Sequence, residues 1–172
     1  MREQIAVRGF IGRHRRALTA VVIGAVALLI FVLVWFQPQK LFIDDTVAEG
    51  LPPAAASGEV TTLTSGTFRG LNHSAEGTAH LIRSEDGTAF VRFADDFVVE
   101  NGPDLVVWLS AAPASSDERA FTEDFIPLAG LKGNIGSQNY EIPSDVDLSR
   151  YRSVLVWCRR FNVGFAAAPL ES

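Results

Sequence analysis

The sequence predicts an all-β fold, an antiparallel β-sandwich or a partly closed barrel, preceded by one N-terminal transmembrane helix. Residues 17–36 form an uncharged apolar segment, whereas short runs of β-branched and aromatic residues recur between turn residues after residue 58. No stretch after residue 58 shows helical periodicity over three turns. Two packed sheets or a closed barrel would bury the apolar faces of such strands.

The transmembrane helix is expected over Ala17–Phe36, which contains no charged residue and no proline. A helix of this length spans roughly 30 Å, the thickness of the hydrocarbon core of a bilayer. A cleaved signal peptide is the alternative, but its apolar core is only about 7–15 residues long and ends at a small-residue cleavage site. The longer segment in this chain favours an uncleaved anchor.

The distribution of charge predicts the orientation of the anchor. Residues 1–16 carry five arginines and one acid, a net charge of +4, so the remaining residues carry −9 of the total of −5. Because basic flanking residues stay in the cytoplasm, we expect a single-pass protein of the cell membrane with a cytoplasmic N-terminus and an extracytoplasmic C-terminal domain. The acidity of that domain excludes nucleic acid as a partner. The expected partners are the membrane, through Ala17–Phe36, and an unidentified redox or envelope protein.

Four parts of the chain follow from these patterns. They are a basic cytoplasmic tail at 1–16, the transmembrane helix at 17–36, an extended linker at 37–57 and an exported β-domain at 58–172. The linker contains three prolines and scattered acids, which favour an extended tether over a second domain.

The strands of the β-domain are expected where β-rich runs end at turn residues. A hairpin turn is predicted at 84–87, a break at 101–103, and a single helical turn within 115–121. The expected strands are 60–63, 67–71, 78–82, 88–93, 105–109, 140–142, 154–158 and 161–166. The aromatic residues expected in the core are Phe68, Phe90, Phe93, Phe97, Trp108, Trp157 and Phe161.

Cys158 is the only cysteine, so a protein expected to be exported has no internal disulfide. In an extended strand Cys158 shares one face with Val154 and Val156, while Trp157 points to the opposite face. Two interpretations stay open. A lone buried cysteine behaves as a small hydrophobic core residue, whereas an accessible thiol near a cation such as Arg160 is a redox group or a ligand.

Metal and haem chemistry have limited support in the residues. His73 and His80 together with Cys158 match the ligand count of a blue-copper site. Copper is disfavoured because no histidine follows the cysteine and the only methionine is Met1. The covalent c-type haem motif is absent, although haem held by the cysteine or a histidine stays open. Hydrolase and transferase motifs are also absent, so we do not expect a classical enzyme or assign a metal site.

An ordered set of short motifs resembles a known family. It runs through Gly66-Thr-Phe68, His73, Gly77-Thr-Ala79, Phe93, Asp96-Phe97, Asn101-Gly-Pro-Asp-Leu105, Leu131-Lys-Gly-Asn134, Asn139-Tyr-Glu-Ile-Pro143, Tyr151-Arg-Ser-Val154, Trp157-Cys158 and Phe161. Together these motifs resemble the Skeletor-type electron-transfer domain, the DM13 family, over roughly residues 60–170. The arrangement here is a bacterial-type, membrane-anchored protein with a single such domain.

The resemblance implies a role in electron transfer at the cell surface. The family's characteristic cysteine, suggested to act as a bare thiol or to hold a group such as haem, corresponds to Cys158. His73 is then a second candidate cofactor ligand. The other positions that match the family are Asp96, Gly102, Pro103, Asp104 and Trp157. The alternative function is a non-catalytic binding or structural module of the cell envelope, with Cys158 as a core residue.

Overall fold

A computed structural model describes residues 2–36, 43–52 and 59–170, with the side chains of 2–14 and 36 left out. The chain divides into two compact units, Met1–Gln39 and Lys40–Ser172. The first unit contains one α-helix, and the described residues of the second form β-strands and short 3-10 turns, so each unit is described by itself.

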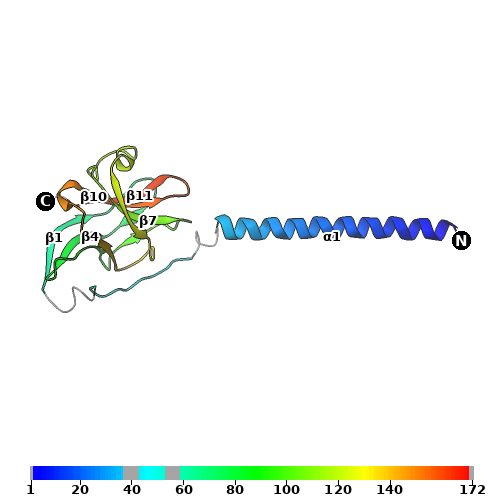
Figure 1. The fold of residues 1–172 in the computed structure, drawn as a ribbon, viewed down its shortest axis with the longest axis horizontal. Helices are drawn as coiled ribbons and strands as arrows, with labels where there is room; N and C mark the ends of the chain where they lie inside the picture. The colour runs from blue at the N-terminus through cyan, green and yellow to red at the C-terminus, as the bar shows by residue number, and fades with distance from the viewer. Residues whose placement is uncertain (1, 37–42, 53–58, 171–172) are drawn as a thin grey trace. The chain divides into compact units, whose positions relative to one another are not determined.

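The first unit consists of helix α1, Arg2–Phe36 (Figure 1). Its segment Arg15–Trp35 has 21 residues and a mean hydropathy of 3.0, and none of it is buried. The helix is therefore long and apolar enough to cross a membrane, a property that an N-terminal signal sequence shares. The predicted segment Ala17–Phe36 lies within this helix, which begins earlier than expected.

The second unit is an antiparallel β-fold. Its longer strands are β1 (Val60–Thr67), β4 (Thr78–Ser84), β5 (Ala89–Phe93), β7 (Leu105–Ser110), β8 (Phe125–Gly130), β9 (Gln138–Ile142), β10 (Ser153–Cys158) and β11 (Val163–Pro169). The short ones are β2 (Arg69–Gly70), β3 (Ala75–Glu76) and β6 (Val98–Val99), and 3-10 turns cover Ala120–Thr122 and Leu148–Arg150. The hairpin predicted at 84–87 is present between β4 and β5, and Gly87 supplies its positive φ of 89°.

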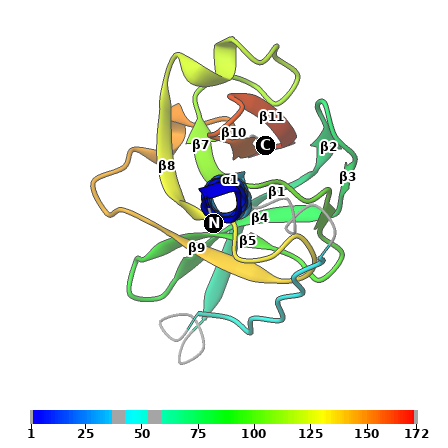
Figure 2. The same cartoon turned by 90° about the vertical axis from the view of Figure 1, so that its right-hand side faces the viewer.

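Two sheets pack face to face and confirm the predicted all-β, antiparallel class (Figures 1 and 2). One sheet has the order β1-β4-β5-β9, the other has the order β2-β11-β10-β7-β8, and β3 pairs with β6. All of these strand pairs are antiparallel, and among the described residues the sheets do not close into a barrel.

The main core lies between the two sheets and follows the alternation of side chains along each strand. Val91 and Phe93 point into it from β5, and Val154, Val156 and Cys158 point into it from β10. The faces of β10 are the predicted ones. A second cluster, which includes Trp108, Phe121, Leu155 and Trp157, lies on the outer face of the five-stranded sheet under the 111–124 loop.

Phe161 is the one expected core aromatic that was assigned wrongly, because it is 58% exposed. It lies in the turn between β10 and β11, beside Asn162, whose positive φ of 53° reverses the chain. The expected strand at 161–166 therefore starts later, at Val163. Strand β8 was not predicted because Pro127 and Gly130 are unfavourable in strands, and β8 is tolerated as the edge of its sheet.

Residues 43–52, within the stretch expected to be an extended linker, run along the loop between β8 and β9. Val47 N–H donates to the Ile135 carbonyl at 2.9 Å, and Glu49 N–H donates to the Ser137 carbonyl at 2.9 Å. A Cβ at Gly136 would lie 2.2 Å from the Val47 carbonyl oxygen, so the approach requires glycine. The expected linker positions 37–42 and 53–57 lie outside the described residues.

Candidate functional site

Cys158 is the last residue of β10 and lies at the end of the sandwich. Its register partners are Leu105, the first residue of β7, and Val163, the first residue of β11. The side chain is 0% exposed and belongs to the core cluster of Val154 and Val156. The two register partners on either side of the thiol are half-buried, so the strands beside it are partly exposed at this end.

An ion pair closes this end of the sandwich. Asp104 Oδ1 lies 2.9 Å from Arg159 Nη2, and Arg159 Nε also donates to Asp104 Oδ2 at 3.3 Å. The Arg159 backbone N–H donates to the Asp104 carbonyl at 3.1 Å. The residue before β7 and the residue after β10 are therefore joined beside the thiol, and this ion pair raises the pKa of Arg159.

The turn before β7 packs against the same end. Pro103 is buried, and a Cβ at Gly102 would lie 2.7 Å from Leu105 Cδ2 and 2.9 Å from Phe165 Cζ. Phe165 occupies the irregularity in the β10–β11 ladder, where the register shifts between Val156 and Trp157. A glycine at position 102 therefore lets the turn lie close to Leu105 and Phe165.

His73 lies over the outer side of Phe165. The two rings stack at a centroid distance of 3.7 Å with 16° between their planes. His73 Nδ1 lies 2.8 Å from Glu100 Oε2, and the Ser74 N–H donates to Glu100 Oε1 at 3.0 Å. The hydrogen bond with His73, followed by that with Ser74, lowers the pKa of Glu100 to about 2.

The structure thus gathers most of the family-matching residues around one end of the sandwich. Cys158 and Phe165 share the main core, Gly102 lies against Phe165, and His73 stacks on it. The link between Cys158 and His73 is therefore indirect, through the Phe165 ring. No pattern along the chain indicates this role of Phe165 or of Glu100, since both lie far from His73 in the sequence.

A haem held by Cys158 does not fit this arrangement. An iron atom and its macrocycle would need open space on the side of the sulfur, whereas the Cys158 side chain is fully buried among apolar neighbours. His73 is half-buried, with one ring face against Phe165 and Nδ1 engaged by Glu100. Cys158 is thus closed to a haem iron, and His73 has one ring nitrogen and one ring face in contact with other residues.

Metal-binding chemistry has no cluster to support it in the described part of the chain. No group of three or more His, Cys, Asp or Glu side chains there could hold a metal ion. His80, which counted toward a copper site in the sequence, lies in β4 with its Nδ1 2.7 Å from Ser65 Oγ on β1. It is therefore a polar residue between two paired strands.

Asp96 lies in the loop after β5, where its hydrogen bonds are made with Thr78. Its carboxylate accepts hydrogen bonds from the Thr78 N–H at 3.0 Å and the Thr78 hydroxyl at 2.9 Å. Gly77 precedes Thr78 with a φ of 105°, and a Cβ there would lie 2.5 Å from the Phe97 Cα. Through these hydrogen bonds the Asp96 carboxylate holds Thr78, the first residue of β4, in place.

Trp157 follows the strand alternation and leaves the core on the opposite face from Cys158. Its ring stacks on Trp108 at a centroid distance of 4.8 Å, with 28° between the planes. Gly164 makes room for it, since a Cβ there would lie 3.2 Å from Trp157 Cζ3. Arg160, the cation expected near the thiol, belongs to the turn after β10, which ends at Cys158.

Comparison with known proteins assigns the domain. The model of the family described as electron transfer DM13 matches residues 67–170, more than half of the chain. No curated protein and no solved structure matches this chain. The match covers the strands and turns that build the Cys158 end, and the role of the family gives the domain a general function in electron transfer. The chain belongs to the DM13 electron-transfer family.

Proposed function

We propose that the electron transfer of this domain depends on Cys158, acting as a bare thiol from a buried position. The observation that carries the proposal is the place of the thiol at the end of β10. Its register partners Leu105 and Val163 are half-buried, and the Asp104–Arg159 ion pair lies directly beyond them. Local opening of strand ends costs less free energy than global unfolding, so this end can open while the sandwich stays folded.

The proposed step moves one electron and one proton. The Cys158 thiol passes an electron to a one-electron acceptor, and its proton goes to water when the strand end opens, which leaves a thiyl radical on Sγ. A one-electron donor and a proton from water restore the thiol. The step involves neither disulfide exchange nor a metal, in keeping with a chain that has one cysteine.

Film voltammetry of the full-length protein in detergent tests this proposal. We expect a one-electron wave in the wild type that Cys158→Ala and Cys158→Ser abolish. Val156→Ala is the matched control, because Val156 lies on the same strand and the same core face and its truncation disturbs packing without removing sulfur. A wave that survives in both Cys158 variants would overturn the role of the thiol.

A second candidate function is a binding or structural module of the envelope with Cys158 as core. The 0% exposure of Cys158 and its apolar neighbours favour this candidate. It predicts that Cys158→Ala lowers stability as Val156→Ala does and leaves partner binding intact. The voltammetry separates the two functions, because a core cysteine gives no wave in any of the proteins.

We also propose that helix α1 anchors the domain to the cell membrane with the N-terminus in the cytoplasm. The excess of arginine in residues 1–16 supports this orientation. The protein should stay with the membrane fraction after a high-pH wash, and protease added outside intact cells or spheroplasts should digest the domain. Release of the domain by the wash would contradict an anchor, and protection from the protease would contradict the orientation.

A further inference from the structure

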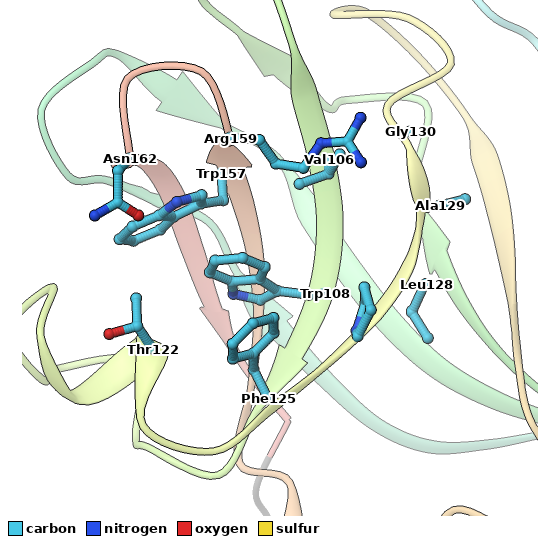
Figure 3. A pocket seen from close by; sticks show the side chains of 11 residues that line it. Val106, Trp108, Thr122, Phe125, Leu128, Ala129, Gly130, Trp157, Arg159 and Asn162 are labelled. Carbon is cyan, nitrogen blue, oxygen red and sulfur yellow. The ribbon is translucent and has the colours of Figure 1, made fainter.

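A pocket of about 570 Å³ lies on the outer face of the five-stranded sheet (Figure 3). Strands β7, β8 and β10 form its wall, and the turn after β10 contributes Arg159 and Asn162. This size is within the range of small-molecule sites, which are mostly apolar with a few polar groups. The pocket is separate from the main core that contains Cys158.

Three aromatic rings follow one another along the pocket, as Figure 3 shows. The Trp157 and Trp108 rings stack at 4.8 Å, and the Trp108 and Phe125 rings lie 4.3 Å apart with 40° between their planes. The tryptophans are only 2% and 5% exposed, whereas Phe125 is 38% exposed. The free surface of Phe125 is therefore the platform on which a flat ring can stack.

The indole N–H of Trp108 has no hydrogen-bond acceptor among the described residues, although the side chain is 95% buried. A buried N–H without an acceptor costs free energy, and tryptophans at such positions normally find a partner. Phe125 lies directly beside the Trp108 ring and is partly exposed. A shift of the Phe125 side chain would therefore give a ligand oxygen access to the Trp108 N–H.

The polar rim of the pocket also favours acceptor oxygens. Arg159 has five N–H groups, of which Asp104 engages those on Nε and Nη2, and no carboxylate lines the pocket. Asn162 contributes an amide, and the Thr122 hydroxyl already donates to the Arg119 carbonyl at 2.9 Å. The pocket therefore offers more side-chain hydrogen-bond donors than free side-chain acceptors beside its aromatic rings.

We propose that this pocket binds a quinone-class molecule, a flat conjugated ring with carbonyl oxygens. The ring stacks on the Phe125 side chain after that side chain has shifted away from Trp108, and its oxygens accept from Arg159 and the Trp108 N–H. The choice of ring rests on the electron-transfer function, because a quinone is a small-molecule acceptor of electrons. The binding itself requires no electron transfer and is independent of Cys158.

Tryptophan fluorescence of the full-length protein in detergent micelles tests the proposal. The chain has three tryptophans, so a Trp35→Phe background leaves only the pocket pair. We expect 2-methyl-1,4-naphthoquinone to quench this emission saturably, and 2-methylnaphthalene, which lacks the oxygens, to bind at least tenfold more weakly. Phe125→Ala should weaken quinone binding about tenfold.

Phe161→Ala is the matched control, because Phe161 is an exposed phenylalanine on the neighbouring turn that does not line the pocket. It should leave quinone binding unchanged, and so should Cys158→Ala. Unsaturable quenching, equal binding of the naphthalene, or equal effects of Phe125→Ala and Phe161→Ala would overturn the proposal. If Cys158→Ala binds the quinone but the wild type shows no redox wave, the proposed role of Cys158 fails while the proposed binding site stands.

The same measurement distinguishes the two sources of such a ring. A quinone with a phytyl tail should bind more tightly than the tailless one in lipid nanodiscs if the ligand comes from the membrane. Equal affinities would identify a soluble quinone as the ligand. Loss of quenching with rising protein concentration would instead show that a second copy covers the pocket, which would overturn the proposal.

Discussion

Asp104 and Arg159 are joined twice at the end of the sandwich, by an ion pair at 2.9 Å and by a backbone hydrogen bond at 3.1 Å. They flank the register pair Leu105–Cys158, so they join the strand that carries the thiol, β10, to its neighbour β7. Asp104 is thus a family-matching position whose ion pair lies next to the cysteine.

Asp104→Asn should therefore speed the reaction of Cys158 with a thiol reagent in the folded protein. Exposed ion pairs contribute little to stability, so we expect a rise in rate of roughly two- to fivefold. Any label is on Cys158, because it is the only cysteine. Asp124→Asn is the control, because it breaks a comparable ion pair with Arg150, 2.7 Å long. That pair lies at the opposite end of the sheet from the thiol. An equal acceleration in both variants would contradict a local opening at Asp104.

Serine and alanine at position 158 should differ in stability, with serine the worse. The Cys158 environment is apolar and fully buried, so a serine hydroxyl there loses water without gaining a partner, at a cost of about 1–3 kcal/mol. Alanine leaves only a small cavity, which costs about 1 kcal/mol. Urea unfolding of the two variants measures the order. A serine variant as stable as the wild type would mean that the thiol faces a polar space.

Gly77→Ala should destabilise the domain by about 2–4 kcal/mol, because a positive φ is strained for alanine and its Cβ would collide with the Phe97 backbone. Gly130→Ala is the control, since nothing lies within 4 Å of the added carbon and its φ is not positive. Urea unfolding of both variants should show a loss for Gly77→Ala and little change for Gly130→Ala. A small effect at Gly77 would contradict the described turn.

The His73–Glu100 contact should fail in acid. The pKa of Glu100 is lowered from 4.5 to about 2 in the folded protein, mainly by the His73 hydrogen bond. A carboxyl group whose pKa is lower in the folded state stabilises the fold at any pH above its pKa in the unfolded state. This contribution is lost as the pH falls from about 4.5 to about 2. Carboxyl NMR should show the Glu100 midpoint moving up toward 4.5 in His73→Ala. An unchanged midpoint would show that His73 is not the cause.

The sequence predicted the β-strands best where apolar residues alternate or run without interruption. The buried run Val154–Cys158 gave both the strand and its two faces, because each residue in it favours extended structure and burial. Strand β8 is not predicted by the sequence because Pro127 and Gly130 are unfavourable in strands. Both residues are tolerated because β8 lies at the edge of its sheet.

The candidate site could be predicted only in part. The resemblance named Cys158, His73 and Asp104, but their relation depends on Phe165 and Arg159, which pairing between distant strands brings beside them. Nothing along the chain marks Phe165 as the ring under His73. Phe161 is wrongly predicted for the opposite reason, since an aromatic residue at the start of the expected strand 161–166 favours a core position although the chain turns there.

The number of electrons that one chain exchanges tests the central claim most directly. In an anaerobic coulometric titration of the full-length protein, free of added quinone, the wild type should release one electron per chain and Val156→Ala should do the same. Cys158→Ala should release none. An equal electron count in the wild type and in Cys158→Ala would contradict a redox role for the thiol.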